Sequence, residues 1–355
     1  MSSSASADEV VVQDAAVVNE GTAVANSGGN VAVGNASNND ATTSQVAAGG
    51  LVAANSASTS NSSDGSASIA TGTASATGNE SSTGVAQTAS NGNGGGLAVT
   101  AQDTDVTNSG AAVANSGLNA AVGNASDNDA STSQTALGLL VASNAASTDN
   151  HSDGSASIYT GAATATGNHS ATGVAQGAHS GPVFGLSIVV QDADVVNQGL
   201  AVANSGLNAA VGNASDNDAS TSQTALGLLV ASNAASTDNH SDGLALIYTG
   251  AATATGNHSA TGVAQGAHSG PVFGLSIVVQ GASVANQGIA VANSGLNGAL
   301  GNGSVNLSAV AQFAAGLLAS NQSALSNNAA GLAAIATGAA WAVGNDSQTG
   351  IIQAA

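Results

Sequence analysis

The sequence contains no lysine, no arginine and no cysteine among its 355 residues, against 20 acidic residues and 6 histidines, so its formal net charge is −20. Nucleic-acid binding draws on cations that displace counterions from phosphates, and anionic membranes attract the same cations. A chain without cysteine has no disulfide framework. No apolar run approaches the ~20 residues of a membrane-spanning helix. We therefore expect neither a nucleic-acid partner nor a membrane span.

Large side chains are also scarce. Aromatic residues make up 2% of the chain and charged residues 6%, whereas hydrophobic residues, mostly small ones, reach 43%. Intrinsic disorder requires low hydrophobicity, which this composition does not have. Small side chains can fill an interior only if the backbones approach one another closely. The composition thus favours a tightly stacked fold over a conventional globular core.

One unit recurs along the chain. The dipeptide Gln13-Asp14 returns as Gln102-Asp103 and Gln191-Asp192, and Gln280 begins a fourth copy, always 89 residues further on. The predicted organisation is a lead-in at 1–12, then repeat units at 13–101, 102–190, 191–279 and 280–355. The last unit is truncated and more apolar, as expected of a cap or a docking end.

Each unit contains a shorter repeat. The glycines of Gly199, Gly206 and Gly212 keep their spacing 44 residues later, and the halves divide again into segments of about 22 residues. Frequent glycine, asparagine, serine and threonine disfavour helix. Short apolar runs between Asn-Ser-Gly and Gly-Asn are typical of strands separated by turns. The predicted fold is all-β: an elongated β-solenoid, similar to a parallel β-helix, with coils of about 22 residues.

Pairs of aspartates are the feature of the sequence that points most clearly to a chemical site. If coils of this length stack about 4.8 Å apart, the pairs form a column, and clustered carboxylate oxygens suit Ca²⁺. The simpler interpretation is that they are solvated turn residues that keep the chain soluble. The candidate calcium ligands are Asp103, Asp105, Asp127, Asp129, Asp192, Asp194, Asp216 and Asp218. No cofactor other than calcium is expected.

The histidines recur only in the second and third units, as His151, His169, His179, His240, His258 and His268. Without cysteine or a short fixed pairing, we interpret them as surface polar residues rather than metal ligands. No nucleophile elbow or other catalytic pattern is present, so we expect no catalytic residue and no enzymatic activity.

Some positions become apolar toward the C-terminus. Ser155 and Ser157 are replaced by Leu244 and Leu246 one unit later, and positions i and i+2 of a strand share a face. We expect one apolar stripe for self-association on the outside of the C-terminal half. The candidate self-association residues are Leu200, Leu244, Leu246, Ile289, Leu332, Phe313 and Trp341.

The segment Gly206-Leu-Asn-Ala-Ala-Val-Gly-Asn-Ala-Ser215, followed by Gln223, resembles the repeats of curlin-type secreted bacterial amyloid proteins. The resemblance covers about every second segment of this kind. It implies secretion and self-assembly into a cross-β fibre. Curlins place glutamine in every coil, whereas Gln13, Gln45 and Gln87 are unevenly spaced here. We therefore expect no continuous glutamine ladder.

Together these features predict a non-catalytic structural protein that assembles with itself into an extracellular fibre or a surface layer, in a matrix or adhesion role. We expect it outside the cell or at the cell surface. The alternative is a ligand-binding surface module: an adhesin stalk, a calcium-dependent attachment module or an ice-binding passenger domain. Thr164 and Thr166 carry the ice-binding interpretation.

Overall fold

The computed structural model describes residues 9–91, 94–180, 183–269 and 274–355. These residues form seventeen strands and no helix.

The first coil contains β1 (Glu9–Asn26), β2 (Val31–Gly49), β3 (Val52–Ala70) and β4 (Ala74–Asn91). The second contains β5 (Gly94–Asn115), β6 (Ala120–Gly138), β7 (Val141–Tyr159) and β8 (Ala163–Ser180). The third contains β9 (Val183–Asn204), β10 (Ala209–Gly227), β11 (Val230–Tyr248) and β12 (Ala252–Ser269). The fourth contains β13 (Leu275–Asn293), β14 (Gly298–Asn302), β15 (Val305–Ala315), β16 (Leu318–Ala336) and β17 (Ala340–Ala354). Of the predicted lead-in, residues 9–12 belong to β1 and residues 1–8 lie outside the described residues.

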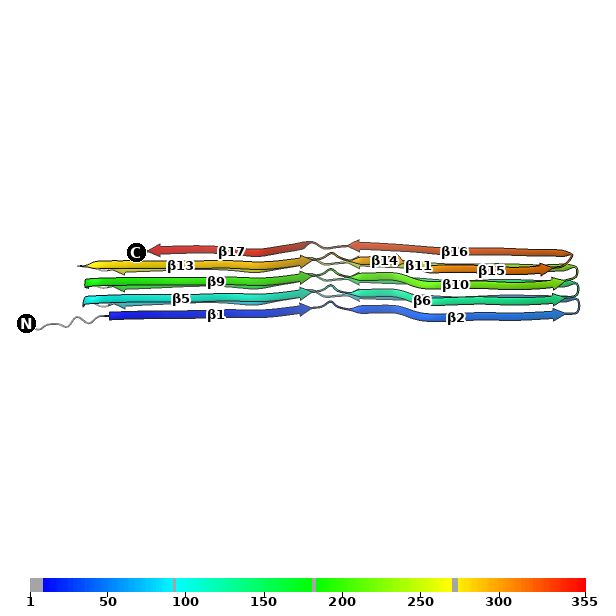
Figure 1. Cartoon of the computed structure of the whole chain (residues 1–355), viewed down its shortest axis with the longest axis horizontal. Helices are drawn as coiled ribbons and strands as arrows, with labels where there is room; N and C mark the ends of the chain where they lie inside the picture. Colours follow the sequence, from blue (N-terminus) through cyan, green and yellow to red (C-terminus); the bar gives the residue numbers. More distant parts are fainter. Residues whose placement is uncertain (1–8, 92–93, 181–182, 270–273) are drawn as a thin grey trace, which may run out of the picture.

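Each coil is a long, flat loop of chain. β1 and β2 run end to end along the molecule, the chain turns back after Gly49, and β3 and β4 return along the other side (Figure 1). Every later coil repeats this path directly above the previous one. β2 packs against β3 and β1 against β4, so the coil is two strands thick.

The stacked strands form four parallel sheets in the described part of the chain. Sheet A contains β1, β5, β9 and β13; sheet B contains β2, β6, β10, β14 and β15; sheet C contains β3, β7, β11 and β16; sheet D contains β4, β8, β12 and β17. Each residue pairs with its counterpart one unit later, as Gln13 does with Gln102. The predicted all-β solenoid is therefore confirmed.

The expected coil length is wrong. A segment of the size expected for a whole coil is one long strand with its turn, and 89 residues are needed to return to the starting point. At about 3.3 Å per residue, the run from Glu9 to Gly49 measures roughly 130 Å. Four coils at about 4.8 Å measure only about 19 Å. The long dimension of the molecule thus lies along its strands rather than along the solenoid axis (Figure 1).

The interior consists of columns of alanine and ladders of amide side chains. Alternate residues of each strand point inward, as Ala112 and Ala114 do in β5. Where inward positions carry asparagine or glutamine, most side-chain amides hydrogen-bond to their counterparts in the next coil. Four-membered ladders include Asn19–Asn108–Asn197–Asn286 and Asn39–Asn128–Asn217–Asn306.

Continuous glutamine ladders are also present, contrary to our expectation. They are Gln13–Gln102–Gln191–Gln280, Gln45–Gln134–Gln223–Gln312 and Gln87–Gln176–Gln265–Gln353. The spacing between Gln13 and Gln45 within one unit has no bearing on the ladders, because each glutamine stacks on its counterpart in the next unit.

Glycines bring the two sides of each coil together. A β-carbon added to Gly110 would overlap the carbonyl oxygen of Gly167, and one added to Gly154 would overlap that of Gly212. Sheets A and D therefore meet at one glycine contact, and sheets B and C meet at another. The glycines of the shorter internal repeat thus face one another across the interior.

The strands of each side join at a kink after Asn115, and its conformation repeats up the stack. Leu118, Leu207 and Leu296 have φ values of 63°, 61° and 56°. Ser116 donates its hydroxyl hydrogen to the Gly161 carbonyl on the opposite side at 2.6 Å, which ties the two kinks together. The turn predicted at Gly-Asn is instead a mid-strand position, since Gly123 and Asn124 lie within β6.

Candidate functional site

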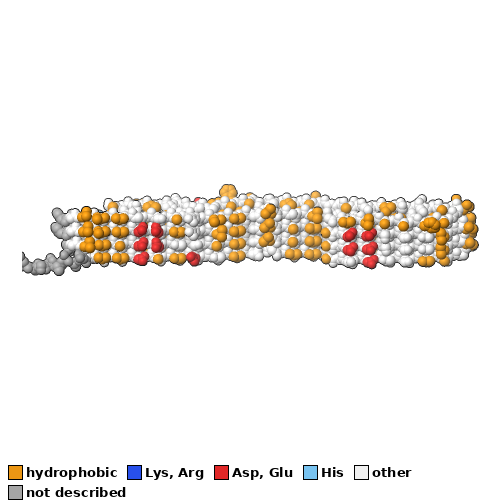
Figure 2. Space-filling model, viewed as in Figure 1, with side chains coloured by type: hydrophobic (Ala, Val, Ile, Leu, Met, Phe, Trp, Pro, Cys, Tyr) orange, Lys and Arg blue, Asp and Glu red, His pale blue; other side chains and the backbone are white. Residues whose placement is uncertain are grey.

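Outward-facing carboxylates form short columns on the two sheets of one face (Figure 2). On sheet A, Asp103 lies between Asp14 and Asp192. On sheet B, Asp129 lies between Asp40 and Asp218. The remaining candidate ligands stack in the same way, as Asp105–Asp194 and Asp127–Asp216.

These columns differ from the one expected. We predicted that successive pairs, such as that of Asp103 and that of Asp127, stack on one another, but these two residues lie on sheets A and B. The prediction failed because it used too short a coil. The four candidate ligands on sheet A and the four on sheet B still offer oxygen atoms of the type that Ca²⁺ prefers. Calcium binding by these columns stays a prediction.

Stacked carboxylates repel one another, and this changes their titration. Burial, followed by the charges of Asp105, Asp14 and Asp192, raises the pKa of Asp103 above 3.8. Likewise, burial and then Asp218, Asp40 and Asp127 raise the pKa of Asp129. Both columns are therefore electrostatically unfavourable when fully ionised.

A second kind of column combines aspartate with histidine on sheet C. Asp149, His151 and Asp153 are alternate residues of β7, and Asp238, His240 and Asp242 stand beside them on β11. The rings of His151 and His240 stack with their centroids 5.1 Å apart. Asp64 extends the column of Asp153 and Asp242 into the first coil.

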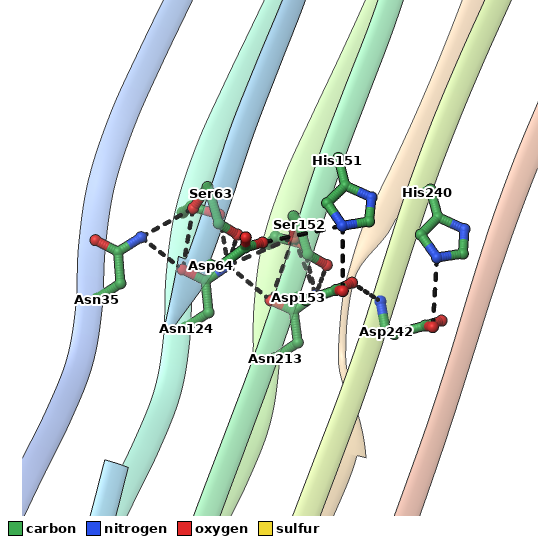
Figure 3. A network of polar contacts seen from close by, with 12 residues as sticks. Asn35, Ser63, Asp64, Asn124, His151, Ser152, Asp153, Asn213, His240 and Asp242 are labelled. Carbon is green, nitrogen blue, oxygen red and sulfur yellow. Dashed lines mark hydrogen bonds and ion pairs between the residues drawn. The ribbon is translucent and has the colours of Figure 1, made fainter. Parts of the chain in front are cut away.

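The interior fixes the positions of these outward side chains (Figure 3). Ser152 lies between His151 and Asp153 but points inward, where its hydroxyl bonds to Ser215 at 2.6 Å. Asn124 donates to the Oδ1 of Asn213 at 3.0 Å. These buried bonds tie β7 and β6 to β10, and the parallel pairing of β7 with β11 places the outward Asp and His side chains in line.

The Asp-x-His-x-Asp pattern was visible in the sequence, but its meaning was not. Alternate residues of a strand share a face, and only stacking one full unit apart places His240 beside His151. Two further pairs stack in the same way: His169 with His258, and His179 with His268. All six histidines lie in such pairs, which the interpretation as surface polar residues did not foresee.

An open groove of about 680 Å³ runs across the coils beside the aspartates of sheet C. Its floor is the glycine column that includes Gly154 and Gly243, and Asp153 and Asp242 line one side. Leu244 and Leu332 also line it. The groove forms because glycine has no side chain to hold sheets B and C apart. The backbone of sheet C therefore lies closer to sheet B at this point, and the outer surface is hollowed.

The seven candidate self-association residues all point outward, but they do not form one stripe. Leu200 and Ile289 lie on sheet A, and Leu244, Leu246 and Leu332 lie on sheet C. Phe313 is on sheet B and Trp341 on sheet D. The replaced positions therefore make two short apolar columns on opposite sides of the molecule, with two separate aromatic residues in the fourth coil.

The two ends of the stack differ in charge. The described residues of the first coil include Glu9, Asp14, Glu20, Asp40, Asp64 and Glu80. In the described part of the fourth coil Asp346 is the sole acidic residue, and Gly281, Leu307 and Ala330 take the places of aspartates.

No known protein family matches this chain, and no curated protein or solved structure matches it either. Nor do the described residues include a helix with the length and apolar character needed to cross a membrane.

Proposed function

We propose that this protein is a non-catalytic structural subunit that assembles head to tail into a fibre, with the fourth coil of one chain stacked on the first coil of the next. The observation that carries this proposal is the open edge at both ends. In the described chain, β1, β2, β3 and β4 each pair with one neighbouring strand only, and so do β13, β16 and β17 at the other end. Unpaired edges of long strands are templates for further pairing.

The ladders give the stack a direction. Asn19 donates its amide hydrogen toward the fourth coil, to Asn108 Oδ1 at 2.7 Å, whereas Gln280 donates toward the first coil, to Gln191 Oε1 at 2.8 Å. A second chain stacked head to tail would continue both kinds of ladder, with donor meeting acceptor. Two like ends placed together would instead make the strands antiparallel, so the amides at the junction would no longer meet their counterparts and the ladders would stop there.

The charges favour the same arrangement. At a head-to-tail junction, Asp14 would face Gly281 of the neighbouring chain, and Asp40 would face Leu307. The carboxylate columns would therefore be interrupted at each junction, which limits their repulsion to two or three coils. Heterologous contacts of this kind produce open filaments rather than closed oligomers.

The resemblance of Gly206–Ser215 to curlin repeats supports the same class, a secreted cross-β fibre with a matrix or adhesion role. The absence of lysine and arginine is compatible with a protein whose main partner is another copy of itself. We place it outside the cell or at the cell surface on these grounds.

A charge placed at the proposed junction tests the arrangement. Leu307→Asp extends the column of Asp218 and would face Asp40 of the next chain, whereas Ala309→Asp adds the same charge beside Ser220 and would face Thr42. At pH 7 we expect Leu307→Asp to associate more slowly than Ala309→Asp by light scattering, and the difference to shrink as the pH is lowered toward 4 and carboxylates take up protons. Equal rates at pH 7 contradict the head-to-tail junction. Urea unfolding of both variants at low concentration separates this effect from added repulsion with Asp218.

A further inference from the structure

Stacking of the coils does not by itself require histidine on sheet C, so these side chains are candidates for a chemical role. The sequence holds no lysine or arginine, yet β7 and β11 set two imidazoles among five carboxylates: Asp64, Asp149, Asp153, Asp238 and Asp242. Imidazole nitrogen combined with carboxylate oxygen is a ligand set for zinc and its neighbours among the transition metals.

The ligand atoms already lie close together. His151 Nε2 is 3.1 Å from Asp153 Oδ2, and His240 Nε2 is 3.3 Å from Asp242 Oδ2 (Figure 3). One ligand atom each from His151, Asp153 and His240 can be chosen so that all three lie within 4.8 Å of one another. Ligands of a tetrahedral Zn²⁺ at about 2.0–2.1 Å are about 3.4 Å apart. Rotation of the two partly exposed imidazoles, whose side chains are 39% and 31% exposed, can close this gap.

Two of the carboxylates have unused oxygen atoms. Among the described residues, Oδ1 of Asp238 and Oδ1 of Asp242 are buried and accept no hydrogen bond. Oδ1 of Asp153 accepts one from the backbone N–H of Asp242 at 3.2 Å, which orients that carboxylate beside the histidines. Buried acceptors without a donor are costly, and a cation bound by Asp242 would offset this cost at one of the two.

We propose that the outer face of sheet C binds one divalent transition-metal ion of the zinc class between the second and third coils, through His151, His240, Asp153 and Asp242. This site is independent of the proposed assembly, because its ligands lie in the two middle coils and not at either end of the stack. The ion would link two coils and offset part of the negative charge along the groove.

The chain supplies its own controls. His179 and His268 stack at 5.2 Å, as closely as the proposed ligands, but their counterpart in the first coil is Ser90 and no metal-binding cluster includes them in the described residues. His169 and His258 stack between Glu80 and Asp346, so they could bind an ion of their own. Every protein in the experiment therefore carries His169→Ala and His258→Ala.

The test is calorimetric titration with Zn²⁺ in excess Mg²⁺. In that background we expect one ion per chain, and an affinity reduced about tenfold or more by His151→Ala with His240→Ala. Asp153→Asn with Asp242→Asn should weaken binding similarly, whereas His179→Ala with His268→Ala should leave it nearly unchanged. Circular dichroism shows whether each variant keeps its strands.

Two results would overturn the proposal. One is an isotherm that His151→Ala with His240→Ala leaves unchanged. The other is an equal loss in the His179 and His268 control, because stacked imidazoles would then suffice without carboxylates. Electron paramagnetic resonance with Cu²⁺ gives a separate check, since coupling to two nitrogens is expected, and coupling to none or to one contradicts the shared site.

Discussion

At the scale of single residues, this fold depends on the small volume of its inward-facing side chains. Alanine and glycine at inward positions let opposite sheets approach. The side-chain amides of asparagine and glutamine then hydrogen-bond both along the stack and across the interior, as Asn108 does to Asn197 Oδ1 and to Thr172 Oγ1. Asn108, Asn217 and Gln191 are fully buried, yet each is hydrogen-bonded to counterparts in neighbouring coils. Satisfied polar ladders of this kind specify register, because a slip of one residue leaves each amide without its partner.

The glycine contacts give a sharp test of this close approach. Gly110→Ala would drive a methyl group into the Gly167 carbonyl, and we expect the free energy of unfolding to fall by about 3 kcal/mol or more. Gly173→Ala is the matched control, because its added methyl group meets nothing within 4 Å. It should change stability by no more than about 1 kcal/mol, in the stabilising direction. Urea denaturation measures both, and equal effects would contradict the close contact.

The carboxylate columns predict an unusual dependence of stability on pH. The folded state raises the pKa of Asp103 and Asp129 above 3.8, so the folded chain binds protons more readily than the unfolded chain. The free energy of unfolding should therefore fall as pH rises from about 3.8 through the raised pKa values, and then level off. Asp103→Asn with Asp129→Asn should flatten this change between pH 4 and pH 7. A parent protein that is more stable at pH 7 than at pH 4 would contradict the argument.

At the scale of strands, the apolar replacements lie outside the interior. Leu244 and Leu246 are partly exposed on β11, while Ala245 and Ile247 between and beside them are fully buried. Leu244 sits in the groove next to Asp242. The leucines can therefore serve as a contact surface without contributing much to the interior of the coil.

Returning both leucines to serine tests that role. Leu244→Ser with Leu246→Ser should change the free energy of unfolding by about 1 kcal/mol or less, because both sites face solvent. Ile247→Ser, which replaces a buried neighbour, should cost about 3 kcal/mol or more. If the leucines form a contact surface, association of the double variant also slows. A double variant that melts as low as Ile247→Ser would place the leucines in the interior.

The strands and their parallel stacking could be predicted from the sequence, because the glycine spacing and the period of the long repeat are explicit in it. The coil length could not. Strands of 18 to 22 residues are far longer than the usual length of about 3–10, and a Gly-Asn pair such as Gly123-Asn124 has the composition of a turn. Local composition therefore favoured a much shorter coil, and with it a wrong partner for every aspartate and histidine.

At the scale of the whole molecule, the four coils form a flat plate whose long dimension follows the strands. Its two ends are open, they differ in charge, and the amide ladders that reach them have a fixed direction. Association should be faster near pH 4 than at pH 8, because the net charge of the chain falls from −20 at pH 7 toward zero near its sequence pI of about 4.1. Added salt should speed association at neutral pH by screening the same charges. Light scattering measures both, and rates that are flat across pH and salt would contradict this role for the carboxylates.

X-ray diffraction from oriented fibres tests the central claim, that chains add along the solenoid axis, most directly. Head-to-tail stacking predicts a reflection at about 4.8 Å along the fibre axis. It also predicts an axial repeat of about 19 Å, four times the strand spacing, because every fourth coil is the one with fewest acidic residues. Electron micrographs should show filaments roughly 130 Å across, which is the length of one side of a coil at the usual rise per residue. A reflection at about 4.8 Å perpendicular to the fibre axis would mean that the plates join end to end along their strands, and would contradict the account.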